Sequence, residues 1–193
     1  DDQMMSRFGY FRTEYFTYDE QRGLRDQGRR YMIKRHNIWK RVEEGDRVIP
    51  MAQRQIRTVP YYLSKHFPND PLLQQAAVDT MKQWNDAMRV GIEALGVNDQ
   101  NDVFVLCQNP VAENDHAACG ERGFSPRMGD LRYSTLHWVD TETLAGLLGY
   151  GPSAADPITG ELISGKAYVY GAAISTWATY ATDVIRYFNG ELE

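Results

Sequence analysis

One long amphipathic stretch restricts the possible folds of this chain more than any other feature. Asp70 can cap a helix that begins at Pro71, where proline suits the first helical position, and Gly96 can end it. Its apolar residues recur at three- and four-residue intervals: Leu73, Ala77, Met81, Trp84, Met88, Ile92 and Leu95. A helix with one apolar face must cover a sheet, and we expect Trp84 to be its largest buried anchor.

Short apolar runs elsewhere predict the strands of that sheet. The run 102–108 (DVFVLCQ) is nearly continuous, as expected of a central strand buried on both faces. The run 56–63 (IRTVPYYL) contains Pro60, which cannot donate to a strand ladder and therefore favours an edge strand or a break. A second helical pattern covers 174–188. These interleaved signals predict an α+β fold, or an α/β-like one, with a mixed and partly antiparallel sheet backed by the long helix.

The stretch 129–171 is the most specific part of the sequence. Residues 131–139 are rich in β-branched and aromatic side chains, which predicts a strand. In 156–160 (DPITG), Asp favours a turn, Pro presets φ and Gly tolerates the left-handed region. Strand-like alternation resumes over 161–170, so we expect an exposed strand followed by a hairpin.

Two motifs in this stretch point to a family. They read GDLRYS over 129–134 and YGPSAADPITGEL over 150–162. They resemble secreted bacterial zinc metallopeptidases of the zincin group, related to the metzincins, in which a GDxRYS strand precedes a YGPSxxDPxTGEI hairpin. The resemblance extends more loosely over about 58–189. It implies that 56–193 form the upper, substrate-side subdomain of a zincin, in one compact unit with an N-terminal arm and strands over 1–55.

The resemblance also implies how a complete domain would work. Its edge strand would lie beside the substrate cleft and offer backbone groups to an extended peptide, with Arg132, Tyr133 and Ser134 as substrate-binding residues. Zinc would be bound by a later HExxH helix, in which two His bind the metal and Glu acts on its water. No two of the chain's four histidines lie within four residues of each other: His36, His66, His116 and His137. We therefore expect this chain alone to bind no zinc and to cleave no peptide.

These observations leave two main hypotheses. In the first, the chain is the substrate-side part of a secreted zinc-dependent metallopeptidase, and the missing C-terminal half of the domain supplies the zinc. In the second, it is a non-catalytic peptide-binding or assembly module derived from the same fold. The alternative to an exposed edge is that the strand over 131–139 is an ordinary strand covered by the N-terminal arm. A hydrolase using Asp130, Asp156 and Glu161 is a weaker third hypothesis, because Asp156 suits a turn and Asp130 suits a strand-entry cap.

Composition limits the classes of partner. The chain has 193 residues, of which 42% are hydrophobic and 24% charged, which is typical of one globular domain. No apolar run is long enough to span a membrane. The net charge is −5, although residues 29–65 hold ten Lys or Arg and three acidic residues. Since these basic residues do not line one helix, pairing with acidic residues of the same domain is favoured over binding to nucleic acid.

Cys107 and Cys119 enclose a short loop. In a secreted protein a disulfide readily closes such a loop and stabilises the fold by about 3 kcal/mol. Asp115, His116 and Glu121 nearby suggest a metal site as the alternative, although the spacing matches no common zinc motif. A reduced pair of thiols is expected if the protein is cytosolic. The disulfide would place the protein in the bacterial periplasm, on the cell surface or outside the cell.

Overall fold

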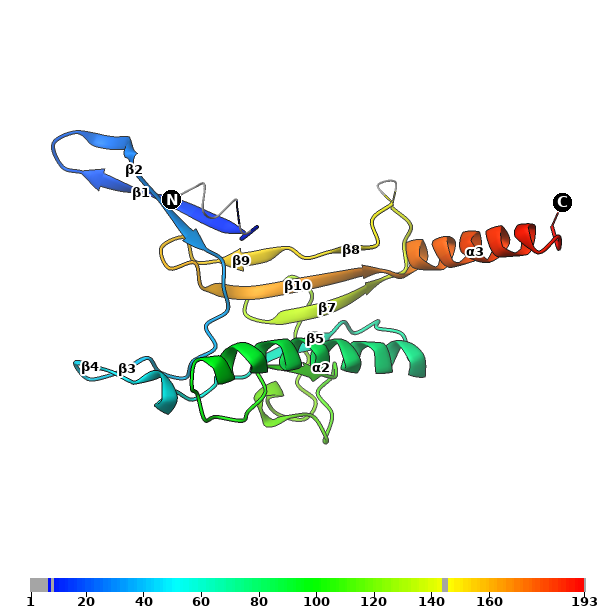
Figure 1. Ribbon diagram of the computed structural model, residues 1–193, viewed down its shortest axis with the longest axis horizontal. Helices are drawn as coiled ribbons and strands as arrows, with labels where there is room; N and C mark the ends of the chain where they lie inside the picture. Colours follow the sequence, from blue (N-terminus) through cyan, green and yellow to red (C-terminus); the bar gives the residue numbers. More distant parts are fainter. Residues whose placement is uncertain (1–6, 8, 144–145, 193) are drawn as a thin grey trace.

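The computed structural model describes residues 7, 9–143 and 146–192. It is an α+β fold in which the longer helix covers one face of a mixed sheet, while the shorter helix and two small hairpins project from this body (Figure 1). The strands are β1 (Arg12–Asp19), β2 (Gly23–Ile33), β3 (Glu43–Glu44), β4 (Arg47–Val48), β5 (Val59–Leu63), β6 (Phe104–Cys107), β7 (Ser134–Val139), β8 (Gly149–Tyr150), β9 (Ser153–Ala155) and β10 (Leu162–Tyr170). The helices are α2 (Pro71–Ala94) and α3 (Gly171–Phe188), with short 3-10 turns η1 (Met51–Gln53) and η2 (Ala117–Cys119).

The main sheet has the strand order β6-β5-β7-β10-β8, and β9 also pairs with β10. Strands β6, β5, β7 and β10 are parallel to their neighbours, whereas β8 and β9 run antiparallel to β10. The predicted mixed, partly antiparallel sheet is therefore confirmed. Parallel strands need long crossover connections, and α2 supplies the one between β5 and β6.

Helix α2 begins and packs largely as predicted. The Asp70 carboxylate accepts hydrogen bonds from the backbone N–H of Leu72 and Leu73 at 2.8 and 3.1 Å. Ala77 and Ile92 are buried on the face that meets the sheet. The prediction for Trp84 was wrong, because 60% of this side chain is exposed to solvent. One position further along the helix, Asn85 occupies the sheet-facing stripe instead.

Asn85 explains how strand β6 ends the sheet. We expected 102–108 to form a central strand, and this was wrong because β6 pairs with β5 on one side only. On the other side the Asn85 amide donates to the Phe104 carbonyl at 2.8 Å, and its oxygen accepts from the Phe104 N–H at 2.9 Å. A side chain of the helix thus replaces the missing neighbouring strand, which is why an apolar run is found at an edge.

Pro60 lies in a central strand, contrary to the prediction of an edge or a break. In a parallel strand, successive residues direct their backbone groups to alternate sides. Val59 donates to Val103 near β6 and Ser64 donates to Leu136 of β7, so Pro60 faces the β7 side. Pairing with β7 begins only at Tyr61, opposite Ser134. The missing N–H of proline therefore falls where no neighbouring strand has begun.

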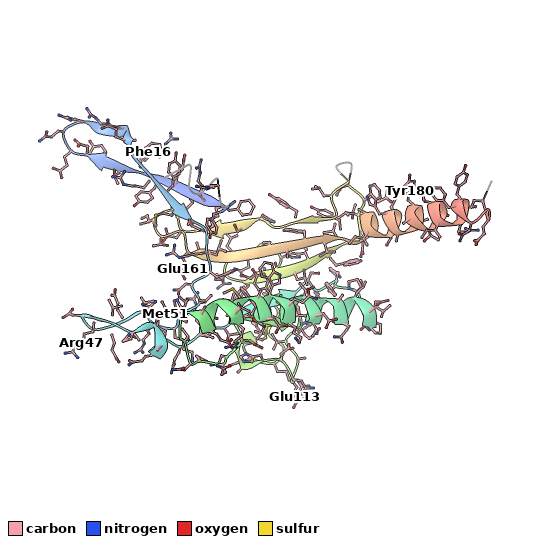
Figure 2. All side chains as sticks on the ribbon, in the orientation of Figure 1. Phe16, Arg47, Met51, Glu113, Glu161 and Tyr180 are labelled. Carbon is pink, nitrogen blue, oxygen red and sulfur yellow. A yellow bond between two sulfur atoms is a disulfide. The ribbon has the colours of Figure 1, made fainter. Side chains whose placement is uncertain are left out.

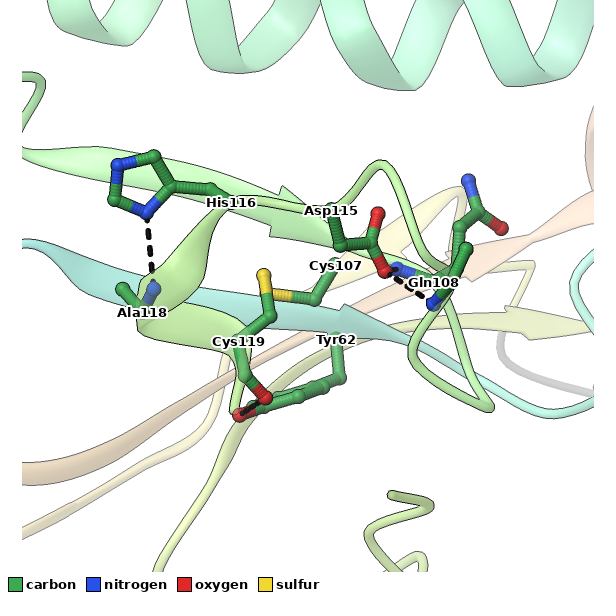
Figure 3. The surroundings of a disulfide bond; sticks show 8 residues. Tyr62, Cys107, Gln108, Asp115, His116, Ala118 and Cys119 are labelled. Carbon is green, nitrogen blue, oxygen red and sulfur yellow. Dashed lines mark hydrogen bonds between the residues drawn. A yellow bond between two sulfur atoms is a disulfide. The ribbon is translucent and has the colours of Figure 1, made fainter. Parts of the chain in front are cut away.

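The predicted disulfide between Cys107 and Cys119 is confirmed (Figure 3). The two Cα atoms are 5.7 Å apart, and both cysteines are fully buried. The Tyr62 hydroxyl donates to the Cys119 carbonyl at 2.9 Å. The bridge thereby fastens the long loop to the end of β6, and the Tyr62 hydrogen bond ties it to the central strand β5. We call this side of the sheet the disulfide face, and the side covered by α2 the helix face.

The N-terminal arm, β1 and β2, is a hairpin whose strands pair only with each other within the described part of the chain (Figure 1). It joins the body at its base, where the Arg35 N–H donates to the Gly160 carbonyl at 3.0 Å and the Leu162 N–H donates to the Arg35 carbonyl at 2.8 Å. The described part of the arm therefore contacts the turn before β10, and its strands do not pair with β7.

Helix α3 confirms the second predicted helix but packs differently from α2. It continues directly from β10 and projects away from the sheet (Figures 1 and 2). Many of its large apolar side chains are exposed: Ile174, Trp177, Tyr180, Ile185, Tyr187 and Phe188. An amphipathic helix is normally stabilised by burying its apolar face, so this surface lacks the cover that α2 has.

Candidate functional site

The predicted edge position of the strand over 131–139 was wrong. Strand β7 lies between β5 and β10 and pairs in parallel with both. The following hairpin folds back along β10 and leaves β7 in the interior of the sheet. The edge on this side of the sheet is the segment 148–155, which includes β8 and β9. We call it the edge segment.

Asp130 and Arg132 form a local ion pair at the entrance to β7. The Arg132 N–H and guanidinium donate to the Asp130 carboxylate, with the shortest contact 2.7 Å from Nη2 to Oδ2. The hydrogen bonds from the Arg132 side chain and backbone lower the pKa of Asp130 to about 2. The carboxylate therefore stays ionised, and the Gly-Asp-x-Arg part of the motif is a capped turn. This agrees with the predicted role of Asp130 as a strand-entry cap.

The side chains of Tyr133 and Ser134 both contact other parts of the protein. The Tyr133 ring packs on the disulfide face, 5.6 Å from the centroid of Tyr62 and 5.2 Å from that of Phe124. Ser134 is buried, and its hydroxyl accepts from the Gly165 N–H of β10 at 3.0 Å. Arg132 is exposed, so the three residues predicted to bind substrate point to different surroundings. Substrate binding by these residues remains a prediction.

The edge segment carries unpaired backbone groups on its outer side. Tyr170 donates to the Leu148 carbonyl at 3.1 Å, and Lys166 donates to the Pro152 carbonyl at 2.9 Å. In an antiparallel strand, alternate residues direct both backbone groups to the same side. The groups of Gly149 and Gly151 therefore point away from β10. No strand pairs with this side within the described residues.

The turn after the edge segment holds its conformation through Asp156. This carboxylate accepts from the Ile158 N–H at 2.9 Å and from the Thr159 hydroxyl at 2.8 Å, and these hydrogen bonds lower the pKa of Asp156. Gly160 has a φ of 75°, in the left-handed region, and the Ile33 carbonyl leaves no space for a side chain there. The Asp-Pro-x-Thr-Gly motif is thus a turn, as predicted, and it also receives the N-terminal arm.

An aromatic ladder connects the edge segment to the centre of the disulfide face. Tyr150, which is exposed, stacks on Tyr168 with ring centroids 6.4 Å apart. Tyr168 in turn stacks on His137 at 4.7 Å. Burial, and secondly the charge of Lys166, lower the pKa of His137, so its imidazole is neutral at pH 7. The ladder gives the edge segment a rigid support.

The histidines do not gather into a metal site. The His36 ring contacts Tyr61 on the helix face, with its Nε2 3.1 Å from the hydroxyl, whereas His137 lies on the disulfide face. His116 accepts from the Ala118 N–H at 3.0 Å (Figure 3). Among the residues that the structure describes, no three His, Cys, Asp or Glu side chains are placed to hold a metal ion. The residues present therefore do not fit a catalytic zinc, which needs three protein ligands.

Comparison with known proteins adds no assignment. No protein-family model matches the chain, and neither does any curated protein or solved structure. Neither helix, over the residues described, is long and apolar enough to cross a membrane.

We expected the edge of the sheet over 131–139, whereas it lies at the edge segment, most of which belongs to the second sequence motif. Pro152 indicates this edge, because proline within a sheet is found mainly in edge strands. Gly149 and Gly151 agree with it, because glycine weakens the interior of a strand. The same reasoning was applied to Pro60, where it failed. Proline marks a position without a ladder bond, and only the neighbouring strands show whether that position is at an edge.

Proposed function

We propose that this chain is the substrate-side part of a secreted zinc-dependent peptidase, and that an extended peptide binds along its edge segment. The observation that carries this proposal is the outward direction of the backbone groups of Gly149 and Gly151 on an antiparallel edge. A peptide can add to such an edge as a further strand, through main-chain hydrogen bonds that do not depend on its sequence. The disulfide supports the secreted location.

The glycines suit this role because they leave space beside the open edge. A Cβ at Gly151 would approach nothing closer than the Lys166 carbonyl at 3.7 Å, so the absence of a side chain is not required by packing. Open edges are usually protected by charges, bulges or covering elements, because they promote aggregation. Two short strands and Pro152 limit pairing with this edge, and the outward groups of Gly149 and Gly151 are the ones left to bind a peptide.

The zinc would come from outside this chain. In the resembled family the metal supplies an activated water, and here the chain's own residues would align the peptide with it. The exposed apolar face of α3 supports a further part of the domain that covers it, with Tyr180 and Phe188 among the uncovered side chains (Figure 2).

The experiment uses the longer natural protein of which we propose this chain to be a part. We expect the longer protein to contain an HExxH helix and to cleave unfolded protein substrates in a reaction that a chelator stops. An open reading frame without paired histidines, or cleavage that is insensitive to chelators, would contradict the peptidase proposal.

A pair of variants at Gly151 tests the edge segment itself. Gly151→Pro removes the outward N–H, and we expect it to lower kcat/KM about tenfold, the effect of losing one or two hydrogen bonds to a bound peptide. Gly151→Ala keeps the N–H and is the matched control. Equal activity of the two variants would show that the peptide does not pair with this edge.

The second candidate is a non-catalytic peptide-binding module. It is favoured by the lack of a three-ligand group among the described residues, since an open edge pairs with a peptide without metal. On this hypothesis the longer protein binds extended peptides, Gly151→Pro weakens that binding, and no cleavage occurs under any condition.

A further inference from the structure

A cavity of about 370 Å³ lies on the disulfide face, away from the edge segment. Ser64, Lys65 and His66 line it directly after β5, and Thr135 and His137 line it from β7. The loop that follows β6 closes the other side. Its volume is at the lower end of the range for small-molecule sites, and ligands of sheets with parallel strands often bind beyond the carboxyl ends of those strands.

Lys65 and Arg127, the two side chains at this cavity that carry a permanent charge, are both positive. Lys65 and Arg127 line it together with His66, and no Asp or Glu does so. Within the described part of the chain, no ion pair joins any of these three side chains to a carboxylate. The cavity is therefore a local positive region with no internal counter-charge.

His137 and Thr135 form the inner wall of the cavity. His137 is 2% exposed, and its Nε2 lies 2.7 Å from the Thr135 hydroxyl, whereas its Nδ1 has no hydrogen-bond partner. When Thr135 donates to Nε2, the neutral ring carries its hydrogen on Nδ1 and is a donor there.

We infer that this cavity binds a compact oxyanion, either phosphate or the carboxylate of a peptide or small acid. Lys65 and Arg127 would supply the positive charge at its mouth, and the His137–Thr135 pair would form its polar wall. Strand β10 lies between the cavity and the edge segment, and none of the lining residues belongs to that segment.

A larger basic hollow offers an internal comparison. It lies beside β3 and β4 and is lined by Lys40, Arg41, Arg47 and Arg54, but also by the carboxylate of Glu44. No buried unsatisfied polar atom lines it. Arg41 therefore serves as a control position at which the same charge is removed from a different basic surface.

The experiment titrates the full chain with sodium phosphate, and separately with sodium acetate, against sodium chloride at matched ionic strength. Calorimetry gives the affinity, and nitrogen-edited NMR follows the imidazole signals of His137. We expect saturable binding of at least one of the two anions and a shift of the His137 signals. The double variant Lys65→Gln, Arg127→Gln should bind about tenfold more weakly, the effect expected for loss of a charged hydrogen bond.

The outcomes separate clearly. A stronger response to phosphate identifies a phosphate ligand, and a stronger response to acetate identifies a carboxylate. Arg41→Gln should bind like the original protein, and circular dichroism confirms that all variants fold. No saturable binding of either anion, unchanged binding in the double variant, or an equal loss in Arg41→Gln would overturn the inference.

Discussion

The two edges of the main sheet are finished in different ways. At the β6 edge, the Asn85 side chain takes both outward backbone groups of Phe104, and the Asp115 carboxylate accepts from the Gln108 N–H at 2.9 Å (Figure 3). At the opposite edge, the outward groups of Gly149 and Gly151 meet no strand within the described residues. The first edge is closed by side chains at Phe104 and Gln108, with Leu106 left open between them, whereas the second is open at both Gly149 and Gly151. This contrast is the reason that we propose the second edge as the peptide-binding surface.

The largest expected effect is on the closed side. Reducing the disulfide, or replacing both Cys107 and Cys119 by Ser, should lower the free energy of unfolding by about 3 kcal/mol, because the unfolded chain gains the freedom of the opened loop. Denaturant unfolding with and without reductant measures this. An unchanged midpoint would show that the loop after β6 contributes nothing to stability.

Asn85→Ala should produce the next largest effect. It leaves the Phe104 N–H and carbonyl without partners, which should lower the free energy of unfolding by about 1–3 kcal/mol. Trp84→Ala is the matched control on the same helix, and because its side chain is 60% exposed we expect a change within about 0.5 kcal/mol. If Trp84→Ala proves the more damaging variant, α2 packs through a different face.

The smallest effect is expected at the open edge. Gly151→Ala should change the free energy of unfolding by about 0.5 kcal/mol or less, since its N–H and carbonyl take part in no ladder. Hydrogen exchange gives a direct comparison of the two edges, in which the Gly151 amide should exchange much faster than the Phe104 amide. Comparable protection of both amides would mean that the two edges are equally closed.

The fold class was predictable because its signals are local. The cap at Asp70, the turn chemistry at Asp156 and the spacing of the two cysteines each depend on a few neighbouring residues, and the structure confirms all three. Strand order was not predictable in the same way. Whether Pro60 or the 131–139 strand lies at an edge depends on partners many residues away.

Trp84 shows a different limit of sequence reasoning. The spacing of apolar residues defines the buried face of a helix only to within about one residue. The size of the Trp84 side chain favoured a face centred on it, and this face was off by one position. Asn85 occupies the buried stripe because its amide can bond with an otherwise unpaired strand. A polar residue was therefore favoured over a large apolar one by the needs of a sheet edge.

The direct join between β10 and α3 has a mechanical consequence. Tyr170 ends the strand, Gly171 begins the helix, and the Trp138 ring lies so close to Gly171 that no side chain would fit there. The helix is thus joined to β10 without an intervening loop. A force applied by a partner at the far end of α3 would therefore be transmitted to β10, the strand with which the edge segment pairs.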